Sequence, residues 1–197
     1  MRFLAVFSWL LSSCLIAAAD GNSVEAQVHQ GFTPGGYIRL RLSPGAYTIV
    51  AGGSDTIRVA YRVANEEELK QVRVKILSSA SSADVSISNT PHNNFKATIE
   101  VPPRSDLRVR MFAGEVVIDG VEGNKDVEVD AGRIEIRIPN PQEYGQREAS
   151  VRAGSIEAAA FDVSKGGLFR SFEQRGPGKY RLHAHVTTGE ISLPGSR

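Results

Sequence analysis

The chain of 197 residues has little cysteine or tryptophan, with one of each, Cys14 and Trp9. A single cysteine can form no disulfide within the chain, so stability must come from buried apolar side chains and backbone pairing. The chain has no large excess of charge of either sign, since it contains 23 basic and 22 acidic residues. Nucleic acids and anionic membranes attract basic proteins, so this balance argues against either as the main partner.

Long apolar runs are lacking after the first 20 residues. The one run, Phe3 to Ile16, is shorter than the ~20 residues that a membrane-spanning helix needs. It follows Arg2 and is succeeded by Ala17-Ala18-Ala19, which is the layout of a secretory signal peptide. We therefore expect residues 1–19 to be removed on export to the periplasm or cell surface, leaving no transmembrane segment.

A second possibility rests on Leu11-Ser12-Ser13-Cys14, which resembles the lipobox of bacterial lipoproteins. In such proteins the cysteine is lipidated and becomes the first residue of the mature chain. That chain would begin with the apolar stretch Leu15 to Ala19, whereas the mature side of a lipobox is usually polar. We favour cleavage after Ala19 and keep a lipoprotein anchored through Cys14 as the alternative.

Helical patterns are scarce. Asn65, followed by three glutamates, predicts a helix of one turn. Elsewhere apolar and polar residues alternate with the period of half-buried strands, over Tyr37 to Leu42, Thr56 to Val63 and Phe95 to Val101. We expect residues 20–36 to be a disordered leader, residues 37–193 to form one β-strand domain and residues 194–197 to form a tail.

One tetrapeptide, a small residue, glycine, a polar residue and a branched aliphatic, occurs four times. The copies begin at Ala113, Ala131, Ala153 and Thr188, and their glycines are 18, 22 and 35 residues apart. Each copy follows an alternating strand, so the glycine marks a corner of the backbone. The pattern predicts an all-β fold, a short parallel β-solenoid with glycine corners. Because the strands from Tyr37 to Val101 lack the repeat, an antiparallel β-sandwich is the alternative.

The order of these motifs resembles the adhesin-like β-strand-repeat family, exported bacterial domains of unknown function. The matching residues are Ile99 to Pro102 leading into Leu107-Arg108-Val109, Ala113 to Gly123, and Gly178 to Leu182 followed by Thr187 to Ile191. The resemblance covers Phe95 to Leu193. It implies a parallel β-solenoid in the cell envelope and brings no catalytic residues.

Signals for catalysis are lacking as well, since no nucleophile elbow of a serine hydrolase is present. The carboxylates from Glu115 to Glu135 are dense enough to suggest the active site of a polysaccharide lyase or glycoside hydrolase. They alternate with valine and isoleucine, however, and interleave with Lys125, Arg133 and Arg137, as on a solvated sheet face. We predict no catalytic residues and no cofactor.

His183 and His185 lie two residues apart and project from one face of a strand, where they could ligate a metal. No third ligand is identifiable from the sequence. The alternating residues Leu182, Ala184 and Val186 take the opposite face, which we predict to be buried. We therefore predict solvent-facing histidines and no metal site.

The stretch from Phe161 to Lys179 is rich in glycine and predicts a loop that carries aromatic and basic side chains. These are Lys165, Phe169, Arg170, Phe172 and Arg175. Either phenylalanine could cap the last coil; alternatively, the five residues bind a partner.

The sequence favours an exported, non-catalytic envelope or surface protein that binds an envelope protein or a surface glycan. A carbohydrate-active enzyme on the same scaffold is the alternative.

Overall fold

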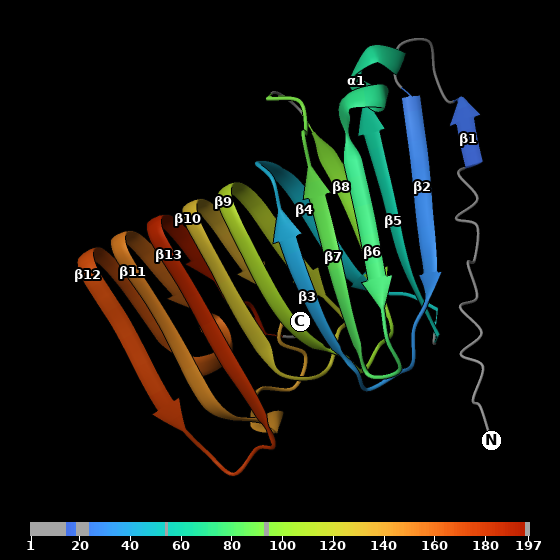
Figure 1. Ribbon diagram of the computed structural model, residues 1–197. Helices are drawn as coiled ribbons and strands as arrows, with labels where there is room; N and C mark the ends of the chain where they lie inside the picture. The colour runs from blue at the N-terminus through green and yellow to red at the C-terminus, as the bar shows by residue number, and fades with distance from the viewer. Residues whose placement is uncertain (1–14, 19–23, 54, 93–94, 196–197) are drawn as a thin grey trace, which may run out of the picture.

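A computed structural model describes residues 15–18, 24–53, 55–92 and 95–195, which form one bent β-sheet of 13 strands (Figure 1). The elements in chain order are β1 (Leu15–Ala18), β2 (Val24–Gly31), β3 (Tyr37–Leu42), β4 (Gly45–Ala51), β5 (Thr56–Val63), α1 (Glu66–Gln71), β6 (Arg73–Ser78), β7 (Ser82–Ser88), β8 (Lys96–Val101), β9 (Asp106–Asp119), β10 (Lys125–Ile136), η1 (Pro141–Glu143), β11 (Tyr144–Ala158), η2 (Ala159–Phe161), β12 (Val163–Arg175) and β13 (Tyr180–Ser192). The expected all-β class is confirmed.

The sheet folds over itself into two layers, because β9 to β13 each bend near their middle (Figure 1). The N-terminal half of β9 pairs with β3 and its C-terminal half pairs with β4. β3, β6 and β7 therefore lie in a first layer with the N-terminal halves of β9, β10, β11 and β13. β2, β4, β5 and β8 lie in a second layer with the other halves, and the core fills the space between the layers.

Glycines form the predicted corners and stack in register from strand to strand. Gly114 has φ +128° and Gly132 has φ +138°, a region that glycine alone enters without strain. A Cβ on Gly132 would lie 1.9 Å from the carbonyl oxygen of Gly114. Gly45 is in register with Gly114, so the N-terminal strands share the same corner.

Strand pairing is mixed rather than uniformly parallel. The central pairs, such as β9 with β10 and β10 with β13, are parallel, whereas β2 with β5, β6 with β7 and β11 with β12 are antiparallel. β12 begins beside the end of β11, just after η2, with Val163 opposite Ala158. It therefore runs back along β11, and the two strands pair antiparallel. Two layers facing one core fit the sandwich alternative better than a parallel solenoid, although the central pairs of the sheet are parallel.

Alternation along the strands correctly predicted much of the core. Ile38 and Leu40 of β3 are buried, as are Val127 and Val129 of β10. Asn65 caps α1, and its side chain accepts a hydrogen bond from the Glu68 N–H at 2.9 Å. No helix among the described residues is long and apolar enough to cross a membrane.

Two segments differ from the sequence prediction. Within the stretch expected to be a disordered leader, Val24–Gly31 is strand β2, paired with β5. The expected loop between Phe161 and Lys179 is largely strand β12, held by antiparallel pairing with β11. The proposed signal peptide lies outside the described residues except for Leu15–Ala18, which form β1.

Candidate functional site

Charged and polar side chains form two rows across the outer face of the first layer, because the strands there lie in register. The first row contains Asp84, Arg39, Arg108, Asp126, His183 and Glu148, on β7, β3, β9, β10, β13 and β11. The second contains Ser86, Arg41, Arg110, Glu128, His185 and Ser150 on the same strands. Arginines thus occupy β3 and β9, while carboxylates and histidines occupy β10 and β13.

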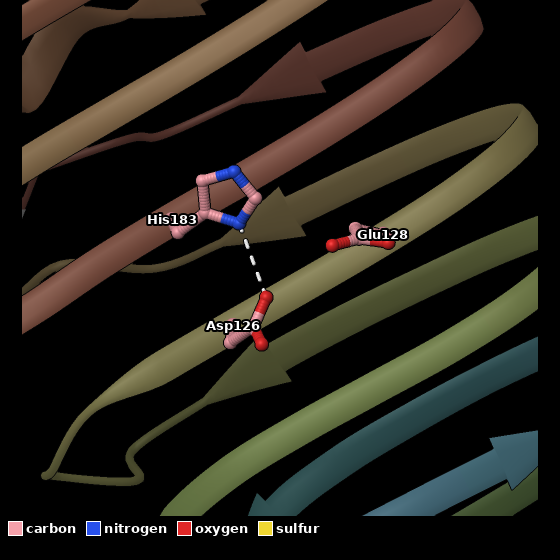
Figure 2. Close-up of side chains that lie close together, drawn as sticks. All are labelled: Asp126, Glu128 and His183. Carbon is pink, nitrogen blue, oxygen red and sulfur yellow. Dashed lines mark hydrogen bonds and ion pairs between the residues drawn. The ribbon is translucent and has the colours of Figure 1, made fainter.

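Where these two blocks meet, Asp126, Glu128 and His183 form a cluster, called here the His183 cluster (Figure 2). Each offers one potential metal-ligating atom, and these atoms lie within 4.8 Å of one another. His183 Nδ1 lies 3.1 Å from Asp126 Oδ1. Arg110 Nη2 lies 2.7 Å from Asp126 Oδ2 and 2.8 Å from Glu128 Oε1, so one guanidinium forms ion pairs with both carboxylates.

Electrostatics keep Asp126 ionised. Partial burial favours the neutral carboxyl, but hydrogen bonds from Arg110 and His183 outweigh it and hold the pKa of Asp126 below its ordinary value. An ionised carboxylate accepts hydrogen bonds and donates none. At neutral pH, Asp126 can orient a neighbouring donor but cannot act as a general acid.

A hollow of about 480 Å³ adjoins the cluster near the corner of the first layer. Its lining includes Arg41, Arg110, Glu128, Asp130 and the exposed ring of Phe112. The surface is therefore both charged and aromatic at this point.

At the far end of the sheet, β12 separates the two phenylalanines that the sequence had grouped. Phe172 is 6% exposed, lies opposite Ala149 and packs against Phe161 with ring centroids 6.3 Å apart. Phe169 is 76% exposed and has φ 52°. Phe172 therefore caps the core, whereas Phe169 points to solvent.

The basic residues of β12 are also separated. Lys165 Nζ donates to the Ser171 carbonyl at 2.8 Å, and Arg170 Nε donates to the Gly166 carbonyl at 3.0 Å. These side chains line a hollow of about 320 Å³; we call its lining, Lys165, Gly166, Phe169, Arg170 and Ser171, the β12 surface. Arg175, at the end of the strand, pairs instead with Glu173.

Sequence reasoning missed Lys125, which was assigned to the solvated face. Its side chain is 2% exposed and points into the core, where Nζ donates to the Gly123 carbonyl at 3.1 Å and to the Tyr144 hydroxyl. Burial lowers the pKa of Lys125 to about 8, although Asp106, Glu122 and Glu143 oppose this shift. Alternation with Val127 and Val129 was the signal that could have identified its inward position.

Known proteins resemble this chain in structure only. No family model matches the sequence, and no curated protein matches it. A "putative cell adhesion protein" from Clostridium sporogenes is 14% identical, with a TM-score of 0.54 over 87% of this chain and 100% of that chain. A "putative adhesin" from Bacteroides fragilis is 10% identical over 86% of this chain and 96% of that chain, with a TM-score of 0.36. The first comparison shows a shared fold, and the second is too distant to add to it.

Proposed function

We propose that this protein is an exported, non-catalytic component of the cell envelope or cell surface that binds a protein or glycan partner through the β12 surface. Residues 1–19 would direct export, and a lipid anchor at Cys14 is the alternative to free release. The name of the Clostridium sporogenes protein that shares the fold supports a role in adhesion.

The observation that carries the proposal is the exposure of two neighbouring apolar side chains on edge strand β12, Phe169 in the β12 surface and Leu168 next to it. Leu168 is 66% exposed and Phe169 is 76% exposed. Phe169 also adopts a positive φ, which is uncommon for a bulky residue and costs of order 1 kcal/mol or more. An exposed ring in a strained conformation contributes little to folding, and aromatic residues beside basic ones are typical anchors of binding surfaces.

The position of β12 adds a second reason. Among the described residues, β12 pairs only with β11, so its other edge is available for backbone hydrogen bonds. Lys165 and Arg170 form no ion pair with a described carboxylate, whereas the arginines of β3 and β9 each do. An incoming partner would therefore meet an apolar anchor flanked by unpaired cations.

The proposal can be tested by screening the purified protein against a glycan array and envelope extracts, with Leu168→Ala/Phe169→Ala beside the wild type. Loss of binding in this variant is expected. Phe112→Ala is the matched control, because Phe112 is 68% exposed but lies on β9, outside the β12 surface. Equal binding by the wild type and both variants would assign recognition to another surface.

A carbohydrate-active enzyme is the second candidate, favoured by the convergence of Asp126 and Glu128 on Arg110 beside a hollow. A glycoside hydrolase of the common type needs one carboxyl with a raised pKa as general acid. The pKa of Asp126 is lowered instead. Release of reducing or unsaturated sugar ends by the wild type, abolished in Asp126→Asn/Glu128→Gln, would establish the enzyme and overturn the non-catalytic role.

A further inference from the structure

We infer that the partner of the β12 surface is an extended, acidic segment of another protein, which adds to the sheet as a strand beside β12. We also infer that Lys165 and Arg170 select this segment over a second copy of the chain. The inference rests on the proposed function, because it names the partner of the same surface.

β12 is the end strand of the sheet and has one unpaired edge (Figure 1). Within the part of the chain that the structure describes, it pairs with β11 alone, from Val163 to Arg175. An unpaired edge presents backbone N–H and C=O groups that an extended segment can bind as a new strand. In such complexes the main-chain hydrogen bonds give affinity and the side chains give selectivity.

Lys165 and Arg170 lie at the end of the core, one on each side of the bend in β12. Lys165 is opposite Ile156, and Arg170 is opposite Val151, and both of these aliphatic side chains are buried. Residues directly opposite each other on paired strands lie on the same face of the sheet, so the cations continue a row that is apolar on β11. Charged side chains at inward positions of an edge strand oppose unselective addition of further strands.

Both cations are available to a carboxylate. Each is exposed and donates to a neutral backbone carbonyl of β12 itself, Lys165 to Ser171 and Arg170 to Gly166. An ionised carboxylate is a stronger acceptor than a neutral carbonyl, so an acidic side chain that arrives at the edge can displace these contacts. The exposed ring of Phe169 lies between the two cations in sequence and supplies an apolar contact.

A second copy of the chain fits this edge poorly. β12 bends at Gly167, which has φ +116° and is in register with the corner glycine Gly154 of β11. If two β12 edges paired antiparallel about a two-fold axis, their bends would have to coincide and their inward residues would have to share one face. Both conditions place Lys165 of each copy beside Arg170 of the other, and like charges on neighbouring strands are destabilising. An acidic segment places opposite charges there instead.

The experiment measures the binding of short fluorescein-labelled peptides to the purified protein by fluorescence anisotropy. In the first peptide, glutamate and valine alternate on both sides of two central glycines, which allow it to bend as β12 does. The second has lysine in place of glutamate, and the third is the acidic peptide with methyl groups on its backbone nitrogens. We expect the acidic peptide to bind roughly tenfold more tightly than either of the others, because it alone supplies both carboxylates and N–H donors. Lys165→Glu/Arg170→Glu should reverse the preference in favour of the lysine peptide.

Lys70→Glu/Lys75→Glu is the matched control, since it makes the same change in charge. Both lysines are exposed, Lys70 on α1 and Lys75 on β6, an edge strand that pairs only with β7 among the described strands. This variant should bind the acidic peptide as the wild type does. Equal losses in the two double variants would overturn the assignment to β12, and so would equal binding of all three peptides by the wild type.

Sedimentation velocity tests the exclusion of a second copy. The wild type should be monomeric, whereas Lys165→Glu should dimerise, because it places a carboxylate beside Arg170 of the other copy. Lys165→Glu/Arg170→Glu should be monomeric again, since like charges meet once more. Circular dichroism establishes that each variant is folded. Dimers of the wild type, or a monomeric Lys165→Glu at the same concentration, would overturn the exclusion.

Sodium polygalacturonate, a polymer of carboxylated sugars, separates the inference from the function on which it rests. Binding of this polymer that is lost in Leu168→Ala/Phe169→Ala, without binding of the acidic peptide, would overturn the inference and leave the β12 surface as a glycan-binding site. Binding of an envelope partner that is unchanged in Leu168→Ala/Phe169→Ala would instead overturn the proposed function.

Discussion

Lys125 and Phe172 show how single residues complete the core, one on a central strand and one on the edge strand of the sheet. Lys125 occupies an inward position of β10, between Leu107 of β9 and Leu182 of β13, and its amine donates hydrogen bonds to two oxygen acceptors. Phe172 fills an inward position of edge strand β12, opposite Ala149 of β11. One residue adds a desolvated amine to the core and the other adds apolar area, so their substitution should have opposite consequences for stability.

Lys125→Met should alter the pH dependence of stability. The folded-state pKa of about 8 lies below the ordinary 10.5, so between these values the unfolded chain holds a proton that the folded chain has released. The unfolding free energy therefore rises with pH across this window. The destabilisation that comes from holding a protonated amine in the core is fully present below pH 8. Urea unfolding at pH 7 and pH 10.5 should show the wild type gaining on the order of 3 kcal/mol relative to Lys125→Met. A constant difference between the two proteins would contradict the buried, protonated amine.

The two phenylalanines of β12 should differ sharply. Phe172→Ala removes a buried ring and should lower the unfolding free energy by roughly 3–5 kcal/mol. Phe169→Ala removes an exposed ring and should change it by less than about 0.5 kcal/mol. Chemical denaturation of both variants measures this, and equal losses would show that the β12 end is packed differently.

At the level of elements, the glycine corners explain how long strands serve two layers. Each corner approaches the backbone of its neighbour so closely that a side chain has no room. The tetrapeptide made these corners predictable from the sequence. β12 was not predictable, because Gly166-Gly167 indicates a loop until β11 is known to pair with it. β2 was missed for a similar reason: its polar pattern is weak, and pairing with β5 makes it a strand.

Gly132→Ala should be among the most damaging substitutions in the chain. It forces a side chain into φ +138° and places Cβ 1.9 Å from the Gly114 carbonyl oxygen. We expect a loss of more than about 3 kcal/mol, or no soluble protein. Gly31→Ala is the control, since nothing lies within 4 Å of its added Cβ. Similar melting temperatures for both variants would refute the role of the stacked corner.

Across the whole molecule, the two candidate surfaces lie on different parts of one body. The residues of the His183 cluster belong to β10 and β13, and those of the β12 surface belong to the end strand β12. Figure 1 shows β11 and β12 to one side of β10 and β13. Partners in the cluster are up to 57 residues apart in sequence. Their approach depends on strand register, which alternation alone does not specify, so the sequence could indicate the histidines but not the carboxylates beside them.

Hydrogen–deuterium exchange tests most directly whether recognition occurs at β12. Exchange of the backbone amides is compared for the free protein and for its complex with the envelope component captured in the binding screen. Slower exchange concentrated in Val163–Arg175 is the predicted result. Protection confined to the charged rows on β9, β10 and β13, with β12 unchanged, would contradict the account.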